Sequence, residues 1–145
     1  MHAPAGTQIA DNKEHTLNEH PNTTLARTMV DAFMRGDLAT VGAAFADDAV
    51  WDLPGRSAVA GEYKGRDAII GFLAKAFELS GGTLQLELVD VLGSDWGAVQ
   101  VQHVRADHGG RTLDCVEVLA HEIVDGKIVR THHRPDQYAI DAFFG

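Results

Sequence analysis

Glu117 and His133 are the two side chains whose types and spacing best suit proton transfer. Glu117 lies in an extended run over residues 112–124, and His133 ends the next run, over 128–133. An imidazole can accept or release a proton near neutral pH, and a neighbouring carboxylate can fix its tautomer and stabilise its protonated form. Without a partner, burial of either group would be costly. Together in a cavity, the two predict acid–base chemistry.

The second half of the chain contains the elements that must position this pair. Its extended runs are rich in Val, Leu and Ile and are separated by Gly-Gly and Asp-Gly turns, which are typical of an antiparallel sheet. If Gly109-Gly110 form a two-residue turn, alternation collects these polar side chains on one face: Gln100, Gln102, Glu117 and His121. The other face collects these small apolar residues: Val99, Val101, Val116, Val118 and Ala120.

The turn before His133 leaves two registers open. With a three-residue loop over 124–126, Glu117 faces His133 directly across the strands. With a two-residue loop the alternation flips, and His132 takes the place of His133 on the polar face. Because the two histidines are adjacent, they point to opposite faces of a regular strand and cannot bind one metal ion together.

Two interpretations of the sheet faces fit the pattern equally well. The valines could form the core and leave the polar set in water. Alternatively, the polar set could line an internal cavity, and the valines could form a surface for a dimer between two sheets.

Helical periodicity dominates the first half of the chain. Residues 1–21 are polar and aperiodic and are predicted to be a disordered arm, followed by one domain over 22–145. Apolar spacing predicts helices from Thr24 to Gly36, from Asp37 as an N-cap, and over 67–79, with a last helical turn after Pro135-Asp136. Helices followed by a meander predict an α+β fold.

Composition excludes several function classes. The chain has 145 residues and a formal net charge of −9, which argues against nucleic acid and anionic membranes as partners. Its single cysteine, Cys115, excludes an internal disulfide, and the absence of a signal-peptide pattern favours a cytoplasmic location. We find no metal-binding motif and no Gly-rich phosphate loop, so no metal and no cofactor are expected.

Several short motifs, taken in order, resemble the NTF2-like superfamily and, within it, the SnoaL-like branch. They are RGDL at 35–38, FADDAVW at 45–51, GEYKGR at 61–66, DGKIV at 125–129 and DQY at 136–138. The resemblance covers about residues 24–145. It implies a cone in which a curved antiparallel sheet wraps around three helices and encloses a pocket, and it implies a homodimer through the convex sheet face. It therefore favours the interpretation with the polar set inside.

The resemblance also bears on activity, because the superfamily includes ketosteroid isomerases, polyketide cyclases, dehydratases, epoxide hydrolases and non-enzymatic binding proteins. The positions of the ketosteroid isomerase catalytic triad align with Met29, Leu53 and Leu119, none of which can transfer a proton. Many SnoaL-like sequences carry an aspartate three residues before the Asp that opens the last helix. That position here is His133, three residues before Asp136.

The leading hypothesis is a cofactor-independent enzyme that performs cyclisation, dehydration or isomerisation on a small apolar or aromatic, polyketide-like molecule. His133 and Glu117 are the predicted catalytic residues. The predicted substrate-binding residues are Trp51, Leu53, Gln100, Gln102, Leu119, His121 and Thr131. The alternatives are a non-catalytic small-molecule-binding domain of the same fold and an interaction module that uses its exposed sheet.

Overall fold

The structure is a computed structural model that describes residues 19–145. The arm predicted for residues 1–21 lies outside the described residues except for its last three. The helices and strands, in chain order, are α2 (Pro21–Met34), α3 (Leu38–Ala43), β1 (Phe45–Leu53), β2 (Gly61–Lys64), α4 (Arg66–Leu79), β3 (Gln85–Gly93), β4 (Gly97–His108), β5 (Arg111–Val124), β6 (Lys127–Arg134) and α5 (Gln137–Phe144).

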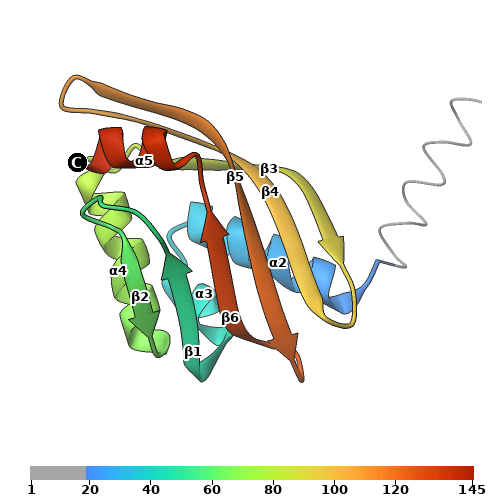
Figure 1. The fold of residues 1–145 in the computed structure, drawn as a ribbon. Helices are drawn as coiled ribbons and strands as arrows, with labels where there is room; N and C mark the ends of the chain where they lie inside the picture. The colour runs from blue at the N-terminus through green and yellow to red at the C-terminus, as the bar shows by residue number, and fades with distance from the viewer. Residues whose placement is uncertain (1–18) are drawn as a thin grey trace, which may run out of the picture.

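One six-stranded sheet, in the order β2-β1-β6-β5-β4-β3, curves around the helices. Figure 1 shows α2, α3 and α4 on one side of the sheet, with α5 close to the long β4–β5 hairpin. This confirms the predicted α+β class. One pairing was not expected, because β1 and β6 run parallel and the sheet is therefore mixed. Turn signals report only strands that follow one another directly, and β1 is separated from β6 by five other elements.

The hairpin formed by β4 and β5 has the predicted register. Gly109 and Gly110 both have positive φ, as a two-residue turn of this kind requires, and His108 pairs with Arg111. The register therefore pairs Gln102 with Glu117, and the polar side chains of this face are buried. The prediction that the polar set faces inward is confirmed for Gln100, Gln102, Glu117 and His121.

In the hairpin formed by β5 and β6, the partner of His133 differs from the predicted one. Its turn is the two-residue one, with Val124 paired to Lys127, so regular alternation would have turned His133 outward. A β-bulge at Val129 adds one residue between the pairs Ile123–Ile128 and Glu122–Arg130, and it restores the inward direction of His133. The direct partner of His133 is consequently Leu119, and the predicted direct pairing with Glu117 is wrong.

Local caps explain where the helices begin. Asp37 caps α3 as predicted, because its Oδ1 accepts from the Thr40 N–H at 3.1 Å. Helix α2 begins at Pro21, before the predicted Thr24, and the His20 Nδ1 accepts from the Asn22 N–H. Asp136 caps α5, the helix that brings Ile140 over one end of the core. Over residues 19–145, no helix combines the length and apolarity that crossing a bilayer requires.

Candidate functional site

A cavity of about 70 Å³ lies between the concave face of the sheet and helices α2, α4 and α5. Its volume is several times the roughly 10–15 Å³ that one water molecule needs. The walls are mostly aliphatic and aromatic, with contributions from Met29, Phe33, Leu53, Phe72, Leu119 and Ile140. Their polar contribution comes from a short set on β1, β4, β5 and β6: Trp51, Gln100, Gln102, Glu117 and His133. The site is therefore an apolar chamber with one polar wall.

Glu117 and His133 form a buried hydrogen-bonded pair on that wall. The His133 Nε2 lies 2.9 Å from the Glu117 Oε2, and the two residues are 9% and 3% exposed. Since His133 pairs directly with Leu119, the contact runs diagonally across β5 and β6, a separation that long side chains can span. The predicted catalytic pair thus meets inside the cavity, although through a different register.

The protonation of Glu117 follows from its neighbours. Burial alone would raise the pKa of this carboxyl, but the neighbouring His133 ring, with its hydrogen bond at 2.9 Å, and the Gln102 hydrogen bond at 2.7 Å outweigh burial and leave the pKa below its usual range. Glu117 is therefore a carboxylate at neutral pH and can accept a proton.

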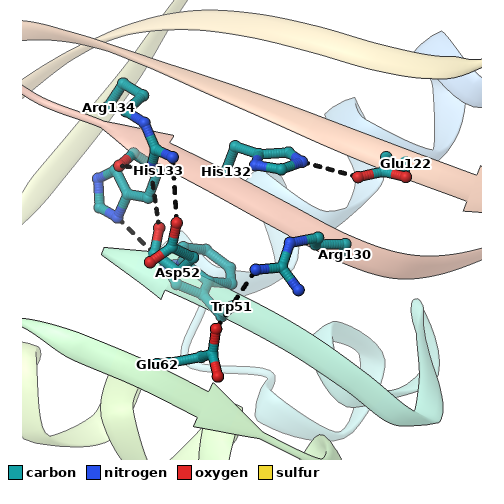
Figure 2. Close-up of polar contacts among 8 residues, drawn as sticks. All are labelled: Trp51, Asp52, Glu62, Glu122, Arg130, His132, His133 and Arg134. Atoms are coloured by element: carbon teal, nitrogen blue, oxygen red, sulfur yellow. Dashed lines mark hydrogen bonds and ion pairs between the residues drawn. The ribbon is translucent and has the colours of Figure 1, made fainter. Parts of the chain in front are cut away.

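Trp51 holds the other ring nitrogen of His133. The indole Nε1–H, which can only donate, gives its hydrogen bond to the His133 Nδ1 at 3.2 Å (Figure 2). The ring proton of the neutral imidazole must then be on Nε2, where it is donated to Glu117. The indole also packs against His133 with ring centres 5.6 Å apart, so the ring plane is fixed as well.

The other predicted substrate-binding residues divide into two groups. Leu53, Leu119, Gln100 and Gln102 line the cavity together with Trp51. His121 and Thr131 are fully buried but are not among the lining residues, and they hydrogen-bond to each other through His121 Nδ1 and Thr131 Oγ1 at 2.7 Å. The structure therefore places these last two behind the polar wall.

Phe72 of α4 belongs to the site although the sequence did not single it out. Its ring centre lies 5.3 Å from that of Trp51 and 6.5 Å from that of His133. The amphipathic period of residues 67–79 predicted that this side of the helix is buried. Nothing local indicates which strand it covers, because that depends on how α4 docks on β1.

Cys115 provides no alternative nucleophile. Burial and the neighbouring Glu117 carboxylate raise the pKa of this thiol to about 11, so the reactive thiolate is scarce at neutral pH. Within residues 19–145, no three His, Cys, Asp or Glu side chains come together as metal ligands.

The opposite face of the same strands carries ion pairs (Figure 2). His132 points away from the cavity, and its Nε2 lies 2.7 Å from the Glu122 Oε2. Arg134 and Arg130 contact Asp52 and Glu62 at 3.0 and 3.3 Å. These groups are partly solvated, so each pair stabilises the fold by about 1 kcal/mol or less. His132 and His133 therefore lie in different environments, as expected for adjacent residues of one strand.

Replacing Trp51 with phenylalanine should lower the free energy of unfolding by about 1–3 kcal/mol, because the buried His133 Nδ1 loses its donor. Urea denaturation at pH 7.5, followed by far-ultraviolet circular dichroism, measures the change. Trp96→Phe is the matched control, since Trp96 is 52% exposed and its replacement should cost about 0.5 kcal/mol or less. Equal losses for the two variants would show that the indole hydrogen bond contributes nothing.

Comparison with known proteins agrees with this architecture. A family model described as a SnoaL-like domain matches residues 26–131. The uncharacterized protein Rv0034 of Mycobacterium tuberculosis is 31% identical over 130 residues, which cover 88% of this chain and 99% of that protein. The structure of Bal32a, from a soil-derived mobile gene cassette, is 33% identical, with a TM-score of 0.83 over 86% of this chain and 97% of Bal32a.

More distant structures share the fold alone. An NTF2-like protein from Burkholderia xenovorans is 21% identical, with a TM-score of 0.72 over 86% of this chain and 96% of its own. TerC, which was co-crystallized with polyporic acid, is 20% identical, with a TM-score of 0.76 over 86% of this chain and 98% of TerC. The family model therefore confirms the predicted SnoaL-like branch, and the similar structures confirm the predicted NTF2-like fold.

Proposed function

The chain belongs to the SnoaL-like family and has the NTF2-like fold, and from this premise we propose that it is a cofactor-independent enzyme that performs acid–base chemistry on a small apolar or aromatic, polyketide-like molecule. The observation that carries the proposal is the carboxylate–imidazole pair buried on the wall of an otherwise apolar cavity. Buried ionisable pairs of this kind concentrate at functional sites. The reaction would be a cyclisation, a dehydration or an isomerisation.

The Glu117–His133 pair carries one negative charge and can accept one proton. In the proposed reaction a substrate C–H or O–H gives its proton to the pair, and the electrons of the broken bond move onto a substrate oxygen. The pair then returns the proton to another substrate atom, or to a leaving hydroxyl, so that it ends unchanged. Gln100 and Gln102 would stabilise the oxygen that gains charge, and the apolar walls would strengthen both effects by excluding water.

TerC, which has a similar fold, was co-crystallized with polyporic acid. From this likeness we infer that a small molecule occupies the cavity. The aromatic side chains of Trp51 and Phe72, which both line the cavity with ring centres 5.3 Å apart, would pack against a ring of that molecule.

Hydrogen–deuterium exchange into a bound ketone tests the proposal without knowledge of the natural substrate. A panel of small aromatic ketones, beginning with 2-indanone, is incubated with the protein in D2O, and proton NMR follows loss of the α-hydrogens. We expect exchange at least about 100-fold faster than in buffer, with most of this gain lost in His133→Ala. Bound ketones that exchange at the buffer rate would overturn the proposal.

That opposite outcome would support a second candidate, a non-catalytic binding domain. It is favoured by one observation: both ring nitrogens of His133 and both oxygens of Glu117 already have hydrogen-bond partners within the protein. A pair so fully satisfied could serve stability alone. Binding without exchange is the result that this candidate requires.

We further propose that two copies of the chain pair through the outer sheet face. Val116 and Val118 are 53% and 37% exposed there, Val118 pairs with Val101 and Val99 pairs with Ala120, while ion pairs flank this apolar strip. Apolar surface of this kind with a charged border is typical of a protein–protein contact.

Sedimentation velocity checks the dimer. The wild-type protein should sediment at twice the 15.6 kDa chain mass, and Val118→Glu should raise the dissociation constant by about a hundredfold, because two carboxylates would face each other in an apolar contact. Leu79→Glu, a similarly exposed residue at the end of α4, should leave the dimer unchanged. A wild-type monomer at micromolar concentration would contradict this proposal.

A further inference from the structure

A continuous hydrogen-bonded chain of side chains starts at Thr131, behind the polar wall, and runs along the wall to Glu117. From the far end, Thr131 Oγ1 contacts His121 Nδ1 at 2.7 Å, and His121 Nε2 contacts Gln100 Oε1 at 2.8 Å. Gln100 Nε2 then donates to Gln102 Oε1 at 2.8 Å, and Gln102 Nε2 donates to Glu117 Oε1 at 2.7 Å. His133 and Trp51 continue the chain on the other side of Glu117.

The donor and acceptor of every hydrogen bond in this chain of side chains follow from the Glu117 carboxylate at its end. An ionised carboxylate only accepts, so Gln102 must turn its N–H toward Glu117 and its carbonyl oxygen toward Gln100. Gln100 must then present its own carbonyl oxygen to His121, which can satisfy it only as the Nε2–H tautomer. The remaining His121 Nδ1 has a lone pair and accepts from the Thr131 hydroxyl. All donors therefore point toward Glu117.

We propose that His121, oriented by Thr131, is a positioning residue that holds Gln100 and Gln102 with their N–H groups turned toward Glu117 and the cavity. It acts through the glutamines, because neither His121 nor Thr131 lines the cavity. Its hydrogen bond fixes which end of the Gln100 amide faces inward. The inference rests on the proposed function only for its catalytic consequence, since the orientation itself is a property of the free protein.

Burial supports the neutral tautomer that this chain requires. His121 is fully buried. Burial is the main cause that lowers the pKa of its imidazole to about 3, and the nearby His133 and His132 lower it further. His121 therefore stays neutral over the whole pH range in which the enzyme would work, and the direction of the hydrogen bonds from Thr131 to Glu117 does not reverse with pH.

One consequence concerns the ligand. Each glutamine spends one N–H on the chain, and within residues 19–145 its second N–H has no partner. Both carbonyl oxygens are engaged, by Gln100 and by His121. The two glutamines therefore offer donors, and the atom of the ligand that lies against them should be a hydrogen-bond acceptor such as a carbonyl oxygen.

Nitrogen-15 NMR of the wild-type protein gives the first test, and it needs no ligand. The ring nitrogen shifts of His121 should report a protonated Nε2 and an unprotonated, hydrogen-bonded Nδ1 at pH 7. A protonated Nδ1, or a mixture of tautomers, would overturn the proposal whether or not the protein is an enzyme.

Two variants give the second test. In His121→Leu the Gln100 carbonyl loses its donor, so the amides can turn over and the Gln102 oxygen can face Glu117. The midpoint of the Glu117 carboxyl titration, measured by carbon-13 NMR, should then rise by about one pH unit. His121→Gln, which keeps a donor N–H, should stay near the wild type. A purely structural residue would lower stability in both variants and leave this midpoint unchanged, which would refute the positioning role.

Ligand preference provides a further readout. The wild-type protein should bind 2-indanone about tenfold more tightly than indane, its analogue without the oxygen, since one hydrogen bond to a donor wall accounts for this difference. His121→Leu should lose most of this preference and His121→Gln should retain it. Loss in both variants, or in neither, would contradict the proposal. Because this is a binding measurement, failure of catalysis in the exchange assay would not affect it.

Discussion

Glu117→Gln should reduce the rate of proton exchange into a bound ketone by about 10²- to 10⁴-fold, the range that one acid–base group contributes. The substitution preserves the shape of the side chain but removes the negative charge with which the pair accepts a proton. Affinity for the same ketone should change by no more than a few fold, because the apolar walls remain. The exchange rate at saturating ketone and the dissociation constant, both measured by NMR, separate these effects.

Glu122→Gln is a matched control for that experiment. Glu122 lies on the same strand, β5, and its carboxylate also contacts a histidine, His132, at 2.7 Å, but on the outer face. The control should exchange at the wild-type rate. A similar loss in both variants would mean that total charge and not the cavity pair sets the rate, and full activity in Glu117→Gln would remove Glu117 from the mechanism.

Acidification below pH 6.5 should destabilise the protein through His121. The pKa of this imidazole is about 3 in the folded state and near 6.5 in the unfolded state, so as the pH falls the unfolded chain binds the proton first. Stability from this group is complete above pH 6.5 and is lost progressively as the pH falls toward 3. Between pH 6.5 and 4.5 the loss amounts to about 2 kcal/mol. Glu117, whose folded pKa is lowered, adds a loss of the same sign below about pH 4.5.

Urea denaturation at pH 7.5, 5.5 and 4.5 measures this dependence. His121→Gln should be less stable than the wild type at pH 7.5, but its stability should fall less steeply with acidification because no buried imidazole remains to be protonated. His108→Gln, at an exposed position, should keep the wild-type slope. If the slopes of His121→Gln and the wild type agree, the acid sensitivity does not come from His121.

The sequence by itself determined the β4–β5 register and the division of its residues between two faces. Gly109-Gly110 supply the positive φ of a two-residue turn, and from there strict alternation of side chains requires Gln102 and Glu117 to share a face. These are local rules, so they can be applied without knowledge of the rest of the chain. The α+β class followed in the same way from helical and extended periodicities.

Tertiary structure decided the direction and the partners of His133. The bulge at Val129 has no clear sequence signal, and one additional residue is enough to turn His133 from the outer face into the cavity. Burial of Thr131 and His133 in the core selects the bulge over the regular strand. The contact between Trp51 and His133, which are 82 positions apart, depends on the parallel pairing of β1 with β6. Pairings between distant segments are set by the packing of the whole core, so turn chemistry and periodicity cannot predict them.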